Sequence, residues 1–530
     1  MNVFKNIVKP IIGYPIYFVF FFVLIGIPEI YVGIRDEYIG LGRFNWAIIN
    51  LTATIFMISY MSSLILYLLP SKVKALYIYI TLVIVVLHFI GSIFLLKTYG
   101  DVLNADIMSI ILNSNKEEMG EYLSMYLPET YFIILIMVFA GILASYYLMN
   151  KYIGRIKCNN ILIGIFLITS LGLTIRRPIY FGDLFPYKYI KFIIQNKVPN
   201  LSEYTKEIQI NSFKSLRPQN IILIIGESFS RHHSSLYGYN KKTNPLLAKL
   251  RNDSLLYVYS DVISPATHTI ACFQNIMSTY NSDNKDSIPW YKCTTLIDVF
   301  RKAKYKTYWV SNQSKHGLYD NIPSKYADLC DKSFWIGNKF ASLNRTTFDE
   351  DLIPLIKPLL NNKDENRLII CHLMGSHQQF QMRYPHKFER FKKQEYEDYP
   401  EFQRDLRATY DNSILYNDSV IYEMMNSFMN EEAIVFYFSD HAIDVFQSKE
   451  EYIGHVRPGD TESIEYGVSI PFMIFTSPLF KEKFPVEMNL IKDCTLQPFN
   501  TGNMIYTLMD LVGISFEGED LEGKSLFRYK

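Results

Sequence analysis

Apolar residues form long runs in the first third of the chain and short runs in the remainder. A membrane-spanning helix takes about 20 apolar residues, and four stretches reach that length. A fifth stretch is shorter but carries no charge. The five predicted spans are 14–34, 48–69, 75–96, 131–149 and 161–175. No small-residue cleavage site follows the first of them, so we interpret it as an uncleaved anchor.

Lysine and arginine residues on alternate loops predict the orientation of these spans. Three segments carry cations and no acidic residue: the N-terminus, the loop after the second span and the loop after the fourth. Their basic residues are Lys5, Lys9, Lys72, Lys74, Lys151, Arg155 and Lys157. Because basic loops stay in the cytoplasm, the N-terminus is expected inside, and five spans place everything after residue 175 outside. Arg176 and Arg177 count against this placement, and three or four spans remain the competing count; an even count would leave the rest of the chain in the cytoplasm.

Two polar segments connect these parts of the chain. The loop 101–127 is expected either to hold a helix on the outer membrane face or to be a simple connector. Within the transition that follows the spans, 184–198 mixes aromatic, lysine and aliphatic residues, as an interfacial amphipathic helix does. We therefore divide the chain into a transmembrane domain at 1–178, an interfacial linker at 179–218 and a globular domain at 219–530.

Short apolar runs alternate with helical patterns from residue 219 onward. The runs are 221–225, 307–310, 368–373, 434–438 and 472–475. Alternation of this kind predicts a mostly parallel sheet with helices on both faces. The expected architecture is an α-helical transmembrane anchor of about five spans followed by a soluble α/β domain.

Composition narrows the classes of function. The formal net charge of +1 gives no argument for nucleic-acid binding. The cysteines show no CxxC pair and no zinc-finger spacing, and one or two disulfides of unspecified pairing are open if the globular domain is exported. The cysteines are Cys158, Cys272, Cys293, Cys330, Cys371 and Cys494.

Side chains that bind metals follow three of the predicted strands. Glu227 follows the run 221–225, His377 follows 368–373, and Asp440 and His441 follow 434–438. In open α/β sheets, ligands bind at the carboxyl ends of the strands. Carboxylate and imidazole groups suit Zn²⁺ or Mn²⁺. A single Asp-His pair is more often structural, but three such strand ends in one domain predict a metal site.

The segment 264–277 holds a candidate nucleophile. Pro265 breaks the chain and a helical pattern begins at Ile270, so Thr267 or Thr269 lies at a helix N-terminus. Free N–H groups and the helix dipole favour a phosphate there. An isolated threonine in this position is usually an ordinary helix cap. Beside a metal ion, the same hydroxyl becomes a candidate nucleophile.

Several motifs occur in an order that resembles one enzyme family. They are GES-x2-R-x3-SLYGY-x3-TNP, PATHTI, NQS, HLMGSH, YDNSILYND, YFSDH, GH and IPFMI. Over nearly its whole length, including the five-span anchor, the chain is similar to the lipopolysaccharide phosphoethanolamine transferases of the alkaline-phosphatase/sulfatase superfamily. The PATHTI segment resembles the branch that modifies inner-core sugars, whereas the lipid A branch has a different, cysteine-flanked nucleophile segment.

The resemblance implies a metal site and a pocket around it. Four residues match the zinc ligands, and Thr269 also matches the nucleophile. The ligands are Glu227, Thr269, Asp440 and His441. Six residues match positions near the substrates: two histidines that contact the phosphoryl group or a second metal, a pocket-lining pair, and a weaker match near the donor lipid. In that order they are His377 and His455, Asn312 and Gln313, and Ser114 and Glu118.

Two departures from the family pattern are visible. Ala442 and Ile443 stand where Gly-Glu is usual, and Val456 stands where an acidic residue is common. Neither replaces one of the four presumed ligands, but the second bears on whether a second metal binds. We therefore expect one zinc ion, with a second ion left open and Mn²⁺ less favoured.

The resemblance implies transfer of phosphoethanolamine from phosphatidylethanolamine to lipopolysaccharide through a phosphoethanolamine–threonine intermediate. An inner-core heptose is the expected acceptor, with lipid A as an alternative. The protein is then expected in the inner membrane, with its N-terminus cytoplasmic and its catalytic domain periplasmic. A phosphoglycerol transferase would share the anchor and the threonine but use another donor. A sulfatase needs a C/S-x-P-x-R segment, which is absent, and the four retained ligands argue against a metal-free scaffold.

Overall fold

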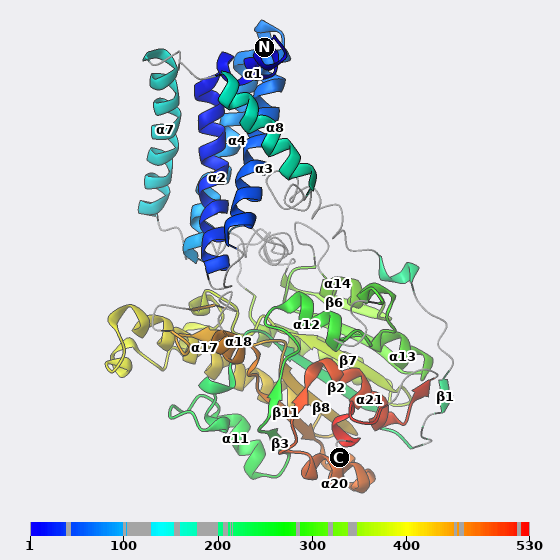
Figure 1. Cartoon of the computed structure of the whole chain (residues 1–530). Helices are drawn as coiled ribbons and strands as arrows, with labels where there is room; N and C mark the ends of the chain where they lie inside the picture. The colour runs from blue at the N-terminus through cyan, green and yellow to red at the C-terminus, as the bar shows by residue number, and fades with distance from the viewer. Residues whose placement is uncertain are drawn as a thin grey trace. The chain divides into compact units, whose positions relative to one another are not determined.

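The structure is a computed structural model that describes most of the chain. The described residues are 2–38, 44–98, 102, 129–152, 160–176, 200–204, 210–212, 214, 216–281, 287–315, 322–337, 347–449, 453–454, 461–516 and 521–528. They divide into two compact units, one up to residue 176 and one from residue 200 onward. Figure 1 labels many of the helices and strands of both units.

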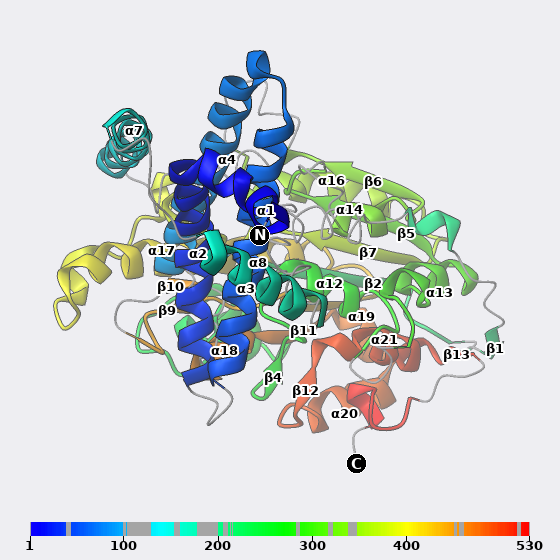
Figure 2. The same cartoon turned by 45° about the horizontal axis from the view of Figure 1, so that its top comes forward.

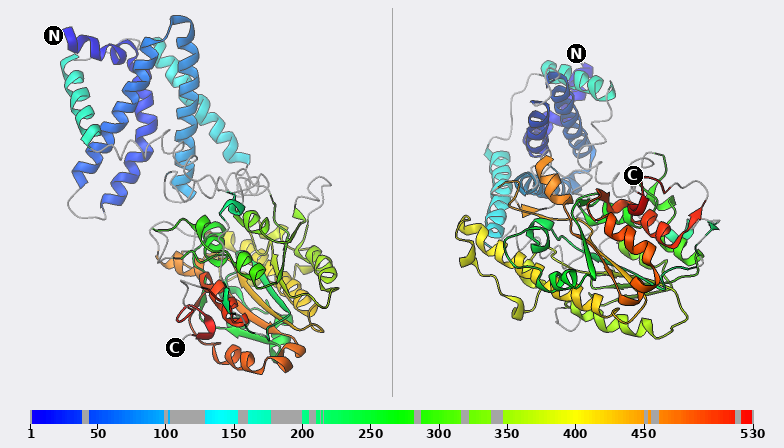
Figure 3. Two further views of the ribbon diagram at one scale, coloured as in Figure 1. Left: turned by 90° about the vertical axis from the view of Figure 1, so that its right-hand side faces the viewer. Right: turned by 90° about the horizontal axis from the view of Figure 1, so that it is seen from below.

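Helices make up the described part of the first unit. They are α1 (Asn2–Gly13), α2 (Pro15–Tyr38), α3 (Phe44–Leu68), α4 (Ser71–Thr98), α7 (Glu129–Tyr152) and α8 (Asn160–Arg176). Each of the five predicted apolar stretches coincides with one of the last five helices. Within the unit, α2 packs against α3 and α4, and α3 packs against α8 (Figures 2 and 3). The sequence pattern did not predict α1.

Three of these helices are long and apolar enough to cross a bilayer, over Ile48–Leu68, Ser71–Leu96 and Leu135–Tyr152. The pair α1 and α2 is bent by 80° and adds a fourth span if it crosses as one. Helix α8 has 17 residues, fewer than the roughly 20 of a typical span. By length and composition, the described residues thus contain three to four candidate spans, and the predicted count of five is not confirmed. The loop 101–127, apart from Val102, and the predicted helix 184–198 lie outside the described residues.

A seven-stranded sheet forms the centre of the second unit, in the order β3-β11-β8-β2-β7-β5-β6. The strands are β2 (Asn220–Gly226), β3 (Leu256–Tyr259), β5 (Lys306–Ser311), β6 (Lys332–Trp335), β7 (Arg367–His372), β8 (Ala433–Ser439) and β11 (Phe472–Thr476). Of these seven, β11 runs antiparallel to both neighbours and the others are parallel to one another. The predicted, mostly parallel sheet is therefore confirmed.

Helices cover both faces of this sheet (Figures 1 and 2). One face packs against α12 (Thr269–Ile276), α13 (Leu296–Lys302), α14 (Ile322–Ala327) and α21 (Met504–Val512). The other packs against α11 (Pro245–Asn252), α16 (Ile353–Ile356) and the long α17 (Glu401–Asn426). Smaller elements are β4 (Val262–Ile263), β9 (Asp444–Val445), β10 (Ile453–Gly454), α18 (Thr461–Val468), α19 (Pro478–Lys483), α20 (Pro485–Asp493) and β12 (Phe499–Asn500).

The central strands are buried on both sides and end together. Alternate residues of β2 enter the two opposite helical layers, which is why this strand reads as a continuous apolar run. In the register of the sheet, Ile225 lies opposite His372 of β7, and Gly226 lies opposite Ser439 of β8. The residues that follow these three strands therefore meet at one edge of the sheet.

Candidate active site

Glu227 follows β2 in a tight turn that neighbouring side chains hold. Ser228 has φ 57°, in the left-handed region that non-glycine residues rarely adopt. The hydroxyl of Tyr410, on α17, donates to Ser228 O (2.8 Å) and accepts from Ser230 N (2.8 Å). Ser228 Oγ donates to Glu227 Oε1 (2.8 Å). These contacts fix the orientation of the Glu227 carboxylate and support the strained backbone.

Glu227, Asp440 and His441 form a buried cluster at the ends of β2 and β8. Each side chain is at most 1% exposed, and their ligand atoms all lie within 4.8 Å of one another. His441 Nε2 lies 3.0 Å from Glu227 Oε1 and 3.5 Å from Asp440 Oδ2. In the described part of the chain, Asp440 Oδ2 has no hydrogen-bond partner. A buried carboxylate oxygen in this state is costly unless a cation binds it, so the residues fit a metal ion.

The charges of the cluster depend on one another. Burial opposes ionisation of Glu227, but the adjacent His441 outweighs burial and holds the pKa of this carboxyl well below its usual value. Burial, together with the Glu227 charge, raises the pKa of Asp440 to about 8. For His441, burial lowers the pKa, but Asp440 and Glu227 raise it to about 9. Two buried carboxylates thus compete for the positive charge of one imidazole, and a divalent cation would satisfy both.

Thr269 places its hydroxyl against this cluster. It is the first residue of α12, preceded by His268 in extended conformation. Thr269 Oγ1 donates to Glu227 Oε2 (3.2 Å) and lies 3.3 Å from His441 Nε2. Of Thr267 and Thr269, Thr269 is the one that the structure brings within hydrogen-bonding distance of the cluster. An anionic group bound here would also face the free N–H groups of the helix N-terminus.

The loop after β7 brings His377 to the same place. Ser376 N donates to Glu227 O (2.9 Å). Gly375 has φ +55°, and a Cβ there would lie 2.7 Å from the backbone N and O of Glu227, so only glycine fits. His377 Nδ1 is buried without a hydrogen-bond partner in the described residues. Burial lowers the pKa of His377 to about 4, so the imidazole is neutral near pH 7.

Gln313 and Asn312 follow β5, and only one of them reaches the cluster. Gln313 Nε2 donates to Glu227 Oε2 (3.3 Å), whereas Asn312 Nδ2 donates to Asp349 Oδ1 (2.9 Å). Asn312 therefore contacts Asp349 and not the metal-type cluster of Glu227, Asp440 and His441. Its motif predicted a position in the lining of the pocket.

Sequence reasoning missed two residues that shape the site. Asp349 is 3% exposed, and its carboxylate accepts hydrogen bonds from Met374 N (2.8 Å) and Gly375 N (2.9 Å) as well as from Asn312. It lies in an acidic run outside every motif, so no sequence signal pointed to it. Ser228, in contrast, stands inside the GES motif and was identifiable as a hydroxyl beside Glu227.

Of the remaining site candidates, departures from the family pattern and cysteines, several lie outside the described residues, and the rest are buried or partly buried. His455, Ser114 and Glu118 lie outside the described residues, and so does Val456. The residues that follow His441 in place of Gly-Glu, Ala442 and Ile443, are both buried in the core. Among the described residues, no disulfide joins Cys272, Cys293, Cys330, Cys371 and Cys494, while Cys158 lies outside the described residues.

Known proteins are similar to this chain in sequence and in fold. The sulfatase family model matches residues 219–514. Phosphoethanolamine transferase EptC of Escherichia coli (strain K12) is 27% identical over 341 residues, which are 61% of this chain and 55% of that protein. The chain thus spans about half the length of this curated relative.

Two solved structures are similar as well. The C-terminal periplasmic domain of E. coli EptC in complex with Zn has 26% identity and a TM-score of 0.55, and the match covers 62% of this chain and 91% of that one. The integral membrane protein lipooligosaccharide phosphoethanolamine transferase A (EptA) from Neisseria meningitidis shares the fold over 97% of this chain and 96% of its own, with a TM-score of 0.65 at 17% identity. EptC, to which this chain is similar, is a phosphoethanolamine transferase. Because the family model spans the whole central sheet and every residue of the buried cluster, this chain belongs to the sulfatase family.

Proposed function

We propose that this protein transfers phosphoethanolamine from phosphatidylethanolamine to lipopolysaccharide. The observation that carries the proposal is the hydroxyl of Thr269, which lies 3.2 Å from Glu227 Oε2 and 3.3 Å from His441 Nε2 at the start of α12. The similarity to EptC supports phosphoethanolamine as the transferred group. The PATHTI segment at 265–270 supports an inner-core heptose as the acceptor, with lipid A as the alternative.

Four residues would hold a zinc ion: Glu227, Thr269, Asp440 and His441. Bound there, zinc would lower the pKa of the threonine hydroxyl and neutralise charge on the phosphoryl oxygens. The buried carboxylates of Glu227 and Asp440 support a cation at this position, and the Zn complex of the E. coli EptC domain supports zinc over Mn²⁺. His377 and His455 are the residues that would contact the phosphoryl group or a second ion.

The residues of the chain account for two successive displacements. Thr269 Oγ1 attacks the phosphorus, a new P–O bond forms to threonine, and the bond to the diacylglycerol oxygen breaks. The proton of the threonine leaves to a base, and diacylglycerol departs after gaining a proton. A sugar hydroxyl then attacks the same phosphorus and gives up its proton, the bond from phosphorus to Thr269 Oγ1 breaks, and the threonine oxygen regains a proton. We assign the proton transfers to His377, whose buried, neutral imidazole has an unpaired Nδ1 among the described residues.

The apolar helices of the first unit support a membrane location. We place the protein in the inner membrane, with its N-terminus in the cytoplasm and the sulfatase-like unit in the periplasm. The lipid donor and the lipid-linked acceptor would then lie in one leaflet. Ser114 and Glu118 are the residues that we assign to the surroundings of the donor.

Vesicles that contain phosphatidylethanolamine, with the purified full chain and lipopolysaccharide, test the proposal. Diacylglycerol release and the mass of the lipopolysaccharide are measured together. We expect Thr269→Ala to abolish both, and Thr267→Ala, the matched control, to retain both. A chelator should abolish both signals and added zinc should restore them.

A fully active Thr269→Ala variant would contradict the proposed nucleophile. Turnover of phosphatidylglycerol but not phosphatidylethanolamine would instead assign a phosphoglycerol transferase. The position of the added mass, on core sugars or on lipid A, decides the acceptor.

A further inference from the structure

A groove of about 1360 Å³ runs along the edge of the seven-stranded sheet. The edge strand β3 contributes Leu256, Tyr257 and Val258, and the opposite wall comes from α19, α20 and the loop that follows β2. No residue of the metal-type cluster lines it. The groove is therefore a second site in the same unit, which the proposed mechanism does not use.

The groove is positively charged. Arg231, Arg251, Lys481 and Lys492 line it, and none of the described lining residues is aspartate or glutamate. None of these four cations forms an ion pair with a carboxylate in the described part of the chain. Arg231 Nη1 is instead held by the carbonyls of Ser260 (2.9 Å) and Val262 (3.4 Å). Backbone carbonyls orient a guanidinium without cancelling its charge, so the groove retains a strong attraction for anions.

The lysines lie close enough to affect each other. Lys481 is partly buried, and burial together with the neighbouring Lys492 charge lowers its pKa. Lys481 Nζ also donates to Ser254 O and lies 5.9 Å from the centre of the Tyr257 ring. Two like charges held together on a protein surface are stabilised when an anion binds between them.

The groove is also lined by aromatic side chains, all of them tyrosines among the described lining residues other than the imidazole of His232. Four of them line it, Tyr237, Tyr239, Tyr257 and Tyr399. A tyrosine presents an apolar ring face and a hydroxyl at its edge. Ring faces of this kind suit the apolar faces of sugars, whereas the hydroxyls of Tyr237, Tyr239 and Tyr257 already donate to Phe472 O, Asp411 Oδ2 and Ser254 O. A groove with both cations and tyrosines matches a sugar chain that bears acidic groups.

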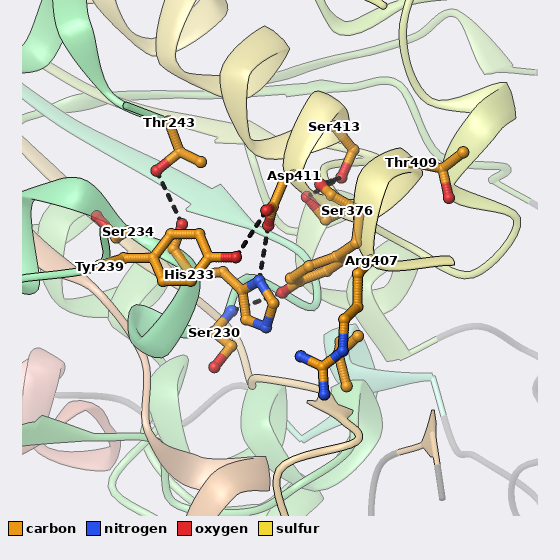
Figure 4. A network of polar contacts seen from close by, with 12 residues as sticks. Ser230, His233, Ser234, Tyr239, Thr243, Ser376, Arg407, Thr409, Asp411 and Ser413 are labelled. Atoms are coloured by element: carbon orange, nitrogen blue, oxygen red, sulfur yellow. Dashed lines mark hydrogen bonds and ion pairs between the residues drawn. The ribbon is translucent and has the colours of Figure 1, made fainter. Parts of the chain in front are cut away.

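The loop that carries part of the groove is fixed in place by α17. Figure 4 shows the side chains of His233 and Tyr239 directed at Asp411. His233 Nδ1 lies 2.7 Å from Asp411 Oδ1, and the Tyr239 hydroxyl donates to Asp411 Oδ2 (2.7 Å). Both His233 and Asp411 are buried. Arg231 and Tyr239 are thus presented by a loop that needs little ordering when a ligand binds.

The groove starts near the catalytic end of the sheet. Arg231 belongs to the turn that begins at Glu227, and it binds Ser260 just past the end of β3. Through β11, that end of β3 is in register with Phe438, near the carboxyl end of β8. Lys481 binds Ser254, at the opposite end of β3. A long ligand in the groove would therefore extend away from the cluster end along the whole strand.

We propose that this groove binds an acidic oligosaccharide, with its phosphate groups on the four cations and its sugar rings against the tyrosines. The inference rests on the proposed function in one respect: the ligand would be the sugar part of the lipopolysaccharide acceptor, held at a distance from the reacting hydroxyl. A peptide that adds to the edge of β3 would need no such charge, which is why a saccharide is favoured.

Binding to the full chain in detergent tests this inference. The probes are a phosphorylated, deacylated core oligosaccharide and the same material after chemical removal of phosphate. The variant Arg251→Gln/Lys481→Gln/Lys492→Gln is compared with Lys302→Gln/Lys332→Gln/Lys357→Gln, a control that removes three exposed charges outside the groove. We expect the groove variant to lose affinity for the phosphorylated probe by on the order of tenfold or more, and the control to bind normally. Removal of phosphate from the probe should weaken wild-type binding to a similar extent.

Several results would overturn the inference: equal affinity of the groove variant and the wild type, equal binding of both probes, or equal competition by an acidic peptide. Complete displacement of the probe by inorganic phosphate at equal concentration would show an adventitious ion site only. If the triple variant fails to fold, the single exposed change Lys492→Gln must still weaken binding severalfold and reduce its dependence on salt. Diacylglycerol release by the wild type, without acceptor, reports separately on the proposed function, so either idea can fail alone.

Discussion

Asp349 shows how a single residue outside the cluster determines its geometry. Its carboxylate accepts three hydrogen bonds, from Met374 N, Gly375 N and Asn312 Nδ2, and the loop that it holds presses Gly375 against Glu227. Burial raises the pKa of Asp349, although these hydrogen bonds oppose the rise. We therefore class Asp349 as a positioning residue for Glu227 and His377.

We predict that Asp349→Ala lowers the rate constant of diacylglycerol release by about tenfold or more. Without its acceptor, each of the three buried donors loses a partner, at roughly 1–3 kcal/mol each, and the loop relaxes. Asp349→Asn, which retains one acceptor oxygen, should restore part of the rate. The rate, the zinc content and the thermal midpoint are measured for each variant. Glu350→Gln, one residue away and more exposed, is the control, and a wild-type rate in Asp349→Ala would contradict the role.

At the residue scale, sequence reasoning found side chains that stand in motifs and missed those that act from outside them. Glu227, Thr269, Asp440 and His441 each follow a strand or begin a helix, so local pattern and motif indicated them together. Asp349 reaches the site only through tertiary contacts between loops far apart in the chain. No local pattern encodes such contacts, and the same holds for the hydroxyl of Tyr410 beneath the Glu227 turn.

Elements in this fold are joined by buried polar contacts as well as by apolar packing. The carboxylate of Asp418, on α17, accepts hydrogen bonds from Leu246 N (2.9 Å) and Leu247 N (3.0 Å), in the first turn of α11. One helix thus caps the N-terminus of another, in place of a local capping residue. Burial raises the pKa of Asp418 from 3.8 to about 7.

This contact predicts a pH-dependent stability. The folded state binds the Asp418 proton more tightly than the unfolded state does. Its contribution is therefore full below about pH 4 and is lost as the pH rises towards 7. Asp418→Asn cannot ionise, so its stability relative to the wild type should rise by on the order of 2–3 kcal/mol between pH 5 and pH 8. Urea unfolding, followed by tryptophan fluorescence, measures the difference.

Asp253, an exposed residue at the C-terminal end of α11, provides the control for the Asp418 experiment. Asp253→Asn, at the other end of α11, also removes a carboxylate, and the pH dependence of its stability is compared with that of Asp418→Asn. If Asp418→Asn shows the same pH dependence as the wild type, the carboxyl does not carry its proton into the folded state near neutral pH. The asparagine variant is expected to be about 1 kcal/mol less stable at pH 5, because one backbone N–H loses its acceptor.

The sequence predicted the inner strands of the central sheet and missed its two edge strands. The strands β2, β5, β7, β8 and β11 lie inside the sheet and read as continuous apolar runs, so the sequence predicted each of them. The edge strands β3 and β6 are only four residues long and were not predicted; β6 begins with Lys332 and Ser333, whereas β3 reads LYVY and was missed although it is as apolar as the inner strands. Strand order and register depend on contacts between distant segments, and the alternating pattern alone did not provide them.

As a whole molecule, the sulfatase-like unit begins well before its first central strand. Leu201 is 3% exposed and belongs to the main core, and β1 (Ile210–Ser212) pairs with β13 (Ser515–Phe516) near the C-terminus. The carbonyl of Pro218 accepts the buried hydroxyl of Tyr305 (2.7 Å). These contacts lie upstream of residue 219, where the composition becomes globular.

A fragment that starts at residue 200 should therefore be more stable than one that starts at residue 219. Burial of Leu201 alone contributes about 1.5–3 kcal/mol, and the β1–β13 pairing adds to it. Both fragments, ending at residue 530, are compared by urea unfolding and by zinc content. We expect both to bind zinc, because the cluster lies within the shorter one, and equal midpoints would contradict the upstream contribution.

The close packing of Gly375 on Glu227 links two parts of the chemistry that are often treated separately. The backbone that carries the proposed metal ligand Glu227 and the loop that carries His377, to which we assign the proton transfers, touch without room for a methyl group. Selection or engineering that altered the preference for one ion over another would therefore disturb proton transfer as well. Changes in ion preference and in acidity profile should arise together in laboratory-evolved variants of this protein.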